Sequence, residues 1–316
     1  MIDLTDQDQL TNLTYPDKTR TNPTEPGSAV SLRPHFTLSL PGGRSLVLGP
    51  RCLLMGILNV TPDSFADGGL WTDPSRAIDA ALRMEAEGAD FIDVGGESTR
   101  PGAEALSQDD ELARVMPVID ALAGRLQIPI SIDTYKAAVA ERAIAAGAAI
   151  VNDISALEYD PALSAVVAST GAALVLMHNR GRSRDMYREA QYGDVVAEVR
   201  DELAARVRTA VAAGIRREQL IVDPGIGFAK HATHSLALLA RLPELAALGL
   251  PVLVGPSRKS FLRLALGDRA PSDRDWGTAA AVATAVLGGA HIVRVHDVKA
   301  MADVARTVDG IVAAGR

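Results

Sequence analysis

Short apolar runs alternate with longer amphipathic segments along most of this chain. Eight of the runs are predicted to be strands, and they cover residues 53–58, 91–95, 129–133, 149–153, 173–177, 220–224, 251–255 and 291–296. The segments between them are rich in alanine and carry charges at helical spacing, which predicts helices, for example over 75–87, 137–146, 194–213 and 278–287. Strands too apolar for simple alternation, each followed by a helix, indicate a parallel sheet covered by helices.

Two architectures fit a parallel sheet of this kind. A doubly wound open sheet gathers its functional groups around one switch point. A (β/α)₈ TIM barrel, which takes about 250 residues, presents the C-terminal ends of all its strands at one mouth. Here polar or charged residues end nearly every predicted strand over positions 51–316, so we predict the α/β fold of a TIM barrel.

The N-terminal fifty residues have a different character. Residues 1–34 contain few apolar side chains and are predicted to be a disordered tail, because they bury too little surface to offset chain ordering. The runs HFTLSL and SLVLG flank the turn residues Pro41, Gly42 and Gly43, which predicts a short β-hairpin over 35–50 that caps one end of the domain. We therefore expect a single domain over 35–316, with the barrel over 51–316.

Composition excludes several classes of protein. The 316 residues are 47% hydrophobic and 22% charged, as in soluble globular proteins, and neither a membrane-spanning run nor a secretory signal is apparent. We expect a cytoplasmic protein without a membrane partner. The single cysteine, Cys52, excludes an intrachain disulfide and a cysteine-built zinc site. The net charge is −7 and no basic tract indicates nucleic acid, although the strand ends themselves carry several cations.

Two polar loops directly follow predicted strands. They read NVTPDSFADGG from Asn59 and GGESTRPGA from Gly95, and they offer amide, hydroxyl and carboxylate groups beside glycines. Each could be an ordinary turn. The other strand ends carry further polar residues, however, and alternation along the last strand places two of them on one face, suited to one phosphate group. These strand-end residues are Asp133, Asn152, Asp223, Lys259, Arg294 and His296.

With these segments the chain resembles the dihydropteroate synthases, pterin-binding enzymes of folate biosynthesis, from about Leu53 to the C-terminus. The family joins a dihydropterin methyl diphosphate to 4-aminobenzoate (para-aminobenzoate). The resemblance implies a TIM-barrel transferase in which diphosphate leaves with Mg²⁺ before the aromatic amine attacks, without a protein nucleophile. It also implies that the catalytic residues are Asp133, Lys259, Arg294 and His296.

The resemblance further assigns residues to three subsites. It implies a pterin pocket of Asp133, Asn152, Asp223 and Lys259, with Met177 and Phe228 against the ring faces, although core packing explains the last two residues equally well. Asn59 is implied as the magnesium ligand, and cations at the diphosphate are implied to be Arg294, His296 and Arg100. The aminobenzoate site is implied to consist of Phe65, Thr99, Arg100, Pro101 and Ser260.

Several alternatives and secondary expectations remain. A corrinoid-linked methyltransferase domain would share the acidic pterin residues but has no diphosphate to hold, and a non-catalytic pterin-binding paralogue would lack some of the cations found here. The resemblance also implies a homodimer, built on helices such as 278–287, and inhibition by sulfonamides. His178 reads as structural, and His231 and His234 lack carboxylate partners for a metal. The chain departs from the family at Ala229, often glycine, and at Ser235, often asparagine.

Overall fold

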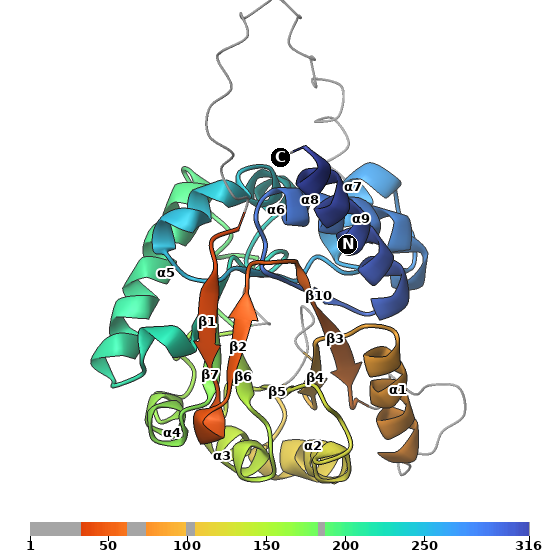
Figure 1. Cartoon of the computed structure of the whole chain (residues 1–316). Coiled ribbons are helices and arrows are strands. Elements are labelled where there is room, and N and C mark those ends of the chain that lie inside the picture. Colours follow the sequence, from red (N-terminus) through yellow and green to blue (C-terminus); the bar gives the residue numbers. More distant parts are fainter. Residues whose placement is uncertain (1–32, 62–73, 99–104, 183–186, 316) are drawn as a thin grey trace, which may run out of the picture. The chain divides into compact units, whose positions relative to one another are not determined.

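A computed structural model describes residues 33–61, 74–98, 105–182 and 187–315. Its main sheet has eight parallel strands in the order β8-β7-β6-β5-β4-β3-β10-β9 (Figure 1). A parallel bridge between Val222 and Val252 joins β8 to the segment entering β9, so the sheet closes into a barrel. The predicted TIM barrel is confirmed. The strands are β3 (Leu53–Asn59), β4 (Phe91–Gly95), β5 (Ile130–Asp133), β6 (Ile150–Asp153), β7 (Ala173–Met177), β8 (Leu220–Asp223), β9 (Leu253–Val254) and β10 (Ile292–Val295).

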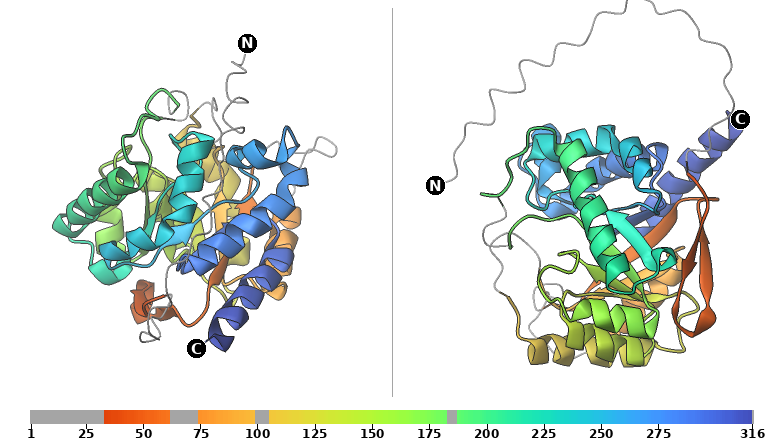
Figure 2. Two further views of the ribbon diagram at one scale, coloured as in Figure 1. Left: turned by 90° about the horizontal axis from the view of Figure 1, so that it is seen from above. Right: turned by 90° about the vertical axis from the view of Figure 1, so that its left-hand side faces the viewer.

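Helices surround the barrel in Figures 1 and 2. The predicted helix over 278–287 begins three residues early, at Asp275. Within it, Gly277 lies so close to Leu266 that a Cβ would come within 2.7 Å of that side chain. Within the described ranges, no helix combines the length and apolar character needed to span a membrane. The α-helices are α1 (Pro74–Ala86), α2 (Gln108–Leu122), α3 (Ala137–Ala145), α4 (Leu163–Thr170), α5 (Val195–Ala212), α6 (Ala232–Ala240), α7 (Arg263–Leu266), α8 (Asp275–Leu287) and α9 (Val298–Ala314).

The predicted hairpin is confirmed and closes one end of the barrel. Strands β1 (Phe36–Ser39) and β2 (Ser45–Leu48) pair antiparallel across a short 3₁₀ turn, η2 (Pro41–Gly43). Their buried leucines, Leu38 and Leu48, pack with side chains from inside the barrel, including Phe91 at the start of β4. The hairpin therefore seals the N-terminal end of the strands, against which it lies in Figure 2, and leaves the C-terminal end for function.

The chain is attached to the barrel before the hairpin begins. Arg33, which the sequence places in the tail, is buried and pairs with Asp309 on α9. The carbonyl oxygen of Pro34 accepts a hydrogen bond of 3.0 Å from Nε2 of His291, whose Nδ1 accepts from the backbone of Val252. The remainder of the predicted tail lies outside the described residues.

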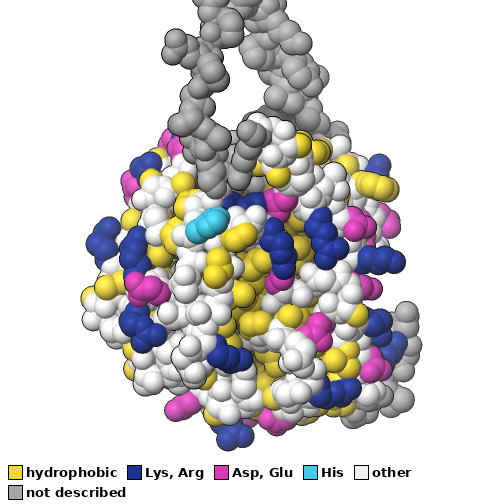
Figure 3. Space-filling view, in the orientation of Figure 1, with side chains coloured by type: hydrophobic (Ala, Val, Ile, Leu, Met, Phe, Trp, Pro, Cys, Tyr) yellow, Lys and Arg dark blue, Asp and Glu magenta, His cyan; other side chains and the backbone are white. Residues whose placement is uncertain are grey.

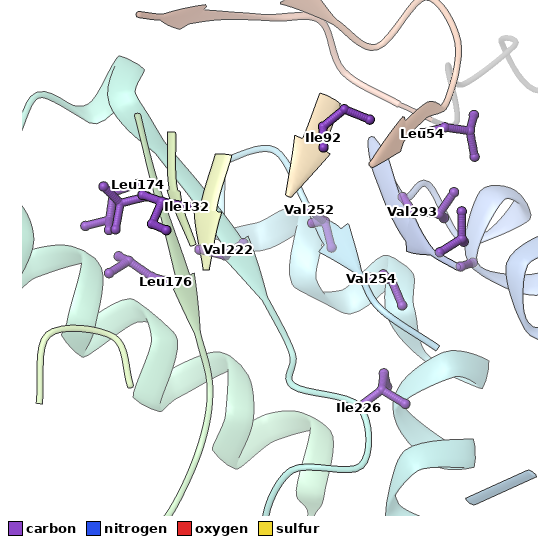
Figure 4. Close-up of a cluster of buried hydrophobic side chains, with 14 of the residues drawn as sticks. Leu54, Ile92, Ile132, Leu174, Leu176, Val222, Ile226, Val252, Val254 and Val293 are labelled. Atoms are coloured by element: carbon purple, nitrogen blue, oxygen red, sulfur yellow. The ribbon is translucent and has the colours of Figure 1, made fainter. Parts of the chain in front are cut away.

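Alternation along the strands separates two buried layers. In β3, Leu53 and Met55 face the barrel interior and join the cluster under the hairpin. Their neighbour Leu54 faces outward and packs with equivalent residues of other strands under the helices, several of which Figure 4 labels. Because side chains alternate along a strand, every second residue faces the barrel interior, and we call this set of positions the interior register. The last residue of the interior register on each strand therefore lies at the C-terminal mouth of the barrel.

Candidate active site

The interior register ends in polar residues on most strands. Four of the six strand-end residues expected from sequence lie on it within their strands: Asp133 on β5, Asn152 on β6, Asp223 on β8 and Arg294 on β10. A carboxylate on β4, Asp93, continues the same register after the interior residue Phe91. The structure thus brings together side chains from five strands at the C-terminal face of the barrel.

Arg294 connects these strands. Its Nε donates to Asp93 at 2.6 Å and its Nη2 donates to Asp133 at 2.8 Å. Asn152 donates from Nδ2 to the same oxygen of Asp93 at 2.9 Å. An arginine fork bonded to two carboxylates has a fixed orientation, which matters for a residue that must face an anion. The cation is therefore held in place before any substrate arrives.

Asp93 is a site residue that the sequence analysis missed. Its side chain is 0% exposed, and its Oδ1 has no hydrogen-bond partner among the described residues. A buried carboxylate is costly unless it is paired, so a carboxylate on an otherwise apolar strand signals a cation nearby. The sequence FIDVG carried that signal, although it could not identify Arg294 as the partner.

Lys259 lies on the other side of this cluster, against the loop that follows β8. Its Nζ donates to the carbonyl oxygen of Ile226 at 2.6 Å and lies 4.6 Å from the centre of the Phe228 ring. In the same loop, Asp223 accepts a 2.7 Å hydrogen bond from the backbone of Gly225 through Oδ1. Phe228 therefore has a lysine over its ring and lies in the loop that follows Asp223, the last residue of β8. A carboxylate, a lysine and an aromatic ring in one loop region are suited to binding a flat polar ring.

Burial shifts the pKa values of Asp133 and Lys259. It raises the pKa of Asp133 to about 7, and the positive charge of Arg294 opposes this shift. Burial also lowers the pKa of Lys259 to about 8, opposed by the negative charge of Asp223. Groups that titrate near neutral pH in a polar strand-end cluster are typical of functional sites.

His296 follows β10 and differs from its expected role as a cation. Its backbone N–H donates to the hydroxyl oxygen of Ser257 at 3.2 Å, so that hydroxyl is free to donate its own proton to Nδ1 of the ring at 2.9 Å. Burial, with the charge of Arg294, lowers the pKa of His296 to about 3. The ring is thus neutral at pH 7 and offers an Nε2–H donor rather than a positive charge.

The other expected site residues have varied surroundings. Met177 ends β7 and is buried, in agreement with either a ring contact or core packing. Ser260 is exposed at the start of the 3₁₀ helix η6 (Ser260–Leu262). Arg258, a cation that the sequence places beside Lys259, is paired with Asp275 on α8 through two hydrogen bonds of 2.7 and 2.9 Å. The residues that lie outside the described ranges are Phe65, Thr99, Arg100 and Pro101.

The two positions at which the chain departs from the family, Ala229 and Ser235, both make hydrogen bonds in the structure. Ala229, where the family often has glycine, adopts a left-handed φ of 46°, a conformation in which glycine is normally favoured. Its carbonyl oxygen accepts a hydrogen bond of 2.9 Å from the hydroxyl of Tyr192. Ser235 is buried, and its hydroxyl accepts a 3.2 Å hydrogen bond from the backbone of Gly227. Both contacts stabilise the loop after β8.

His231 and His234 lie outside this cluster of strand-end residues. Among the described residues, no group of three or more histidine, cysteine, aspartate or glutamate side chains could hold a metal ion. His231 and His234 lie with ring centres 5.4 Å apart, and His234 packs edge-on against Tyr192.

Known proteins share this architecture over nearly the whole chain. Residues 55–296 match the family described as pterin binding enzyme. A dihydropteroate synthase from Synechocystis is 49% identical over 281 residues, which are 89% of this chain and 97% of that protein. The solved structure of Xanthomonas albilineans dihydropteroate synthase with 4-aminobenzoic acid has a TM-score of 0.81 and 44% identity, covering 87% of this chain and 98% of that one.

A second solved structure, the Yersinia pestis dihydropteroate synthase in a sulfonamide drug complex, has a TM-score of 0.82 and 42% identity. It covers 88% of this chain and 98% of that chain. Identity of this extent over matched lengths goes well beyond a shared fold. The chain belongs to the pterin binding enzymes and, among them, to the dihydropteroate synthases, which are transferases.

Proposed function

We propose that this chain condenses (7,8-dihydropterin-6-yl)methyl diphosphate with 4-aminobenzoate to give 7,8-dihydropteroate and diphosphate, by a dissociative substitution at the methylene carbon. The observation that carries the proposal is the bridge that Arg294 makes to Asp93 and Asp133 beside Asn152. It presents a fixed cation, carboxylates and an amide at one mouth, as a polar ring with an anionic leaving group requires.

Each side chain has a role in this reaction. A carboxylate accepts two parallel hydrogen bonds from an aminopyrimidine edge, a role we give to Asp223 and Asp133, while Asn152 both donates and accepts. Lys259 donates to the ring, and Phe228 with Met177 packs against its faces. At the methylene, Arg294 and the Nε2–H of His296 stabilise the charge that develops on the departing diphosphate. The protein thus supplies positioning and electrostatics.

The donor set suits Mg²⁺ as cofactor, with Asn59 as its protein ligand. Asn59 ends β3, and the next residue, Val60, donates its backbone N–H to Gly95 at the end of β4 at 2.8 Å. Mg²⁺ prefers oxygen ligands, keeps several waters and binds substrate phosphates, so one amide oxygen suffices on the protein side. When bound, the ion would neutralise part of the diphosphate charge.

Genetic complementation tests the proposed reaction. Expression of the chain in a bacterium that lacks its own dihydropteroate synthase is expected to restore growth on medium without folate end products. The Arg294→Ala variant serves as the matched negative control. Folded wild-type protein that fails to restore growth would contradict the proposal and favour a pterin-binding protein without turnover.

The pH dependence should report Lys259. With a pKa of about 8, its side chain carries its charge below that pH and loses it above. We expect kcat/KM for the dihydropterin diphosphate to fall about tenfold for each pH unit above 8, since this parameter reports the free enzyme. In Lys259→Arg, whose guanidinium stays charged, the fall should disappear below pH 10. A wild-type profile that stays flat to pH 9.5 would contradict the assignment.

We propose that the chain forms a homodimer through α8. Trp276 is 85% exposed and Leu287 is 50% exposed, and their spacing of three helical turns places them on one face with the exposed Ala280. After Asp275 the helix contains no charged residue, which is unusual for a face left in water. Trp276→Glu is expected to convert a dimer into a monomer by sedimentation velocity. A wild type that is monomeric at micromolar concentration would contradict the proposal.

Sulfonamides and nucleic acids call for different expectations. We propose that sulfonamides compete with 4-aminobenzoate, and the relationship to the Yersinia pestis enzyme supports this. An inhibition constant far above the KM for 4-aminobenzoate would contradict it.

On the hairpin face drawn in Figure 3, basic and acidic side chains are interspersed among the described residues. On that face, the described basic side chains therefore form no continuous positive patch of the kind that attracts nucleic acid.

A further inference from the structure

Lys230 lies buried directly behind the loop that carries Asp223 and Phe228. Its side chain is about 2% exposed, and its Nζ lies 2.9 Å from Nδ1 of His178 and 2.9 Å from the carbonyl oxygen of Phe228. The carbonyl oxygen of His178 is a third acceptor at 3.3 Å. Burial lowers the pKa of Lys230 well below its ordinary value, and its Nζ lies within hydrogen-bond distance of all three acceptors.

His178 is oriented from both sides of its ring. Because Nδ1 accepts from Lys230, the proton of the neutral ring resides on Nε2, which donates to Glu202 at 3.0 Å. Glu202 on α5 is held in turn by Arg180, which donates from Nε at 3.3 Å. Burial lowers the pKa of His178 to about 4, so the ring stays neutral at physiological pH. The contacts therefore run from α5 through His178 to the loop.

The loop itself lies hard against the end of β7. Gly225 has a φ of +68°, and a Cβ at this position would come within 2.0 Å of the carbonyl oxygen of His178. Two lysines then bond to loop carbonyls: Lys259 to that of Ile226 and Lys230 to that of Phe228. Lys259 faces the ring in the proposed reaction, whereas the side chain of Lys230 is only 2% exposed and lies behind the loop.

We propose that Lys230, held by His178, is a positioning residue that sets the loop 223–229 so that Asp223 and Phe228 bind the dihydropterin ring. The inference rests on the proposed function, because it names what the loop must hold. A loop held only by its own backbone contacts would sample several conformations. Ring binding would then have to order the loop, which lowers the affinity for the ring. Lys230 orders the loop in the free protein, so this loss of affinity is avoided.

Two substitutions at His178 separate this role from simple packing. In His178→Asn, the amide oxygen can occupy the position of Nδ1 and accept from Lys230, while the contact to Glu202 is lost. In His178→Gln, the longer amide reaches the position of Nε2 and keeps Glu202, while Lys230 loses the side-chain acceptor at Nδ1 and keeps only its two backbone acceptors. Both variants remove the same ring, so a loss of core packing affects them alike.

Calorimetry with the dihydropterin diphosphate measures the consequence. We expect Kd to rise about tenfold in His178→Gln and in Lys230→Met, the effect of one lost buried hydrogen bond, and to stay within about threefold in His178→Asn. The KM for 4-aminobenzoate at saturating dihydropterin diphosphate should be unchanged in all three variants. Misfolded molecules lower the binding stoichiometry and not the Kd, so a purely structural defect gives a different readout.

The outcomes distinguish this inference from the proposed function. Equal Kd values for His178→Asn and His178→Gln, or a wild-type Kd for Lys230→Met, would overturn the positioning role. Wild-type protein that binds the dihydropterin diphosphate but makes no dihydropteroate would overturn the proposed reaction alone, since the binding comparison among the variants still holds.

Discussion

Replacing Arg294 by alanine is expected to lower the rate of dihydropteroate formation about a thousandfold, as loss of a preorganised charge at a developing anion does. The side chain is fixed by Asp93 at 2.6 Å and by Asp133 at 2.8 Å, so its charge is in place when diphosphate departs. The neutral His296 cannot replace that charge. Steady-state product formation under saturating substrates measures the effect.

The control for Arg294→Ala must address folding, because the substitution leaves the buried carboxylate of Asp93 without its cation. The double variant Asp93→Asn with Arg294→Ala removes both charges and should fold better than the single variant while remaining equally slow. Arg294→Lys keeps the charge but not the two-carboxylate bridge, and an intermediate rate is expected. Retention of more than a tenth of the wild-type rate by folded Arg294→Ala would contradict the role.

Replacing Asp223 by asparagine is expected to raise the Kd of the dihydropterin diphosphate about a hundredfold. The amide oxygen of asparagine still accepts from the backbone of Gly225, a contact of 2.7 Å in the native loop. The new amide nitrogen, however, replaces the second carboxylate oxygen and faces the donors of the ring. Two buried polar groups then lack partners, at roughly 1 to 3 kcal/mol each. Calorimetry measures the Kd directly.

Asp153 offers a matched control for Asp223. It also ends a strand and is buried, but it lies on the outward register next to Asn152 and bonds to the backbones of Ser155 at 2.7 Å and Leu157 at 2.6 Å. Asp153→Asn should lower the stability of the fold and leave the Kd of the dihydropterin diphosphate within about twofold, because the Asp153 side chain points away from the barrel interior and bonds to backbone N–H groups. Equal losses of affinity in the two variants would show that Asp223 acts only through the fold.

Much of the site was predictable because two regularities combine. Apolar runs locate the strands, and alternation then determines which residue at each strand end faces the interior. Asp133, Asn152 and Asp223 were singled out as strand-end residues and by the family resemblance, and in β5, β6 and β8 they lie on the interior register at the mouth. The hairpin was predictable for a similar reason, because turn residues separate two short alternating runs.

Pairing between distant residues was not predictable from these regularities. Arg294 meets Asp93 across 201 positions of sequence, and no local pattern encodes that contact. Arg258 and Lys259 are adjacent cations in the sequence, yet one pairs with Asp275 on α8 and the other bonds to the carbonyl oxygen of Ile226 at the mouth. The neutral state of His296 likewise depends on burial and on Arg294, which only the folded structure reveals.

The most direct measurement is the steady-state formation of 7,8-dihydropteroate from the dihydropterin diphosphate and 4-aminobenzoate, with and without Mg²⁺. The account predicts that wild-type protein makes dihydropteroate and diphosphate in equal amounts, that chelation of the metal stops both, and that Arg294→Ala makes neither at an appreciable rate. Calorimetric binding of the dihydropterin diphosphate by wild-type protein, with no product formed in the presence of Mg²⁺, would contradict it.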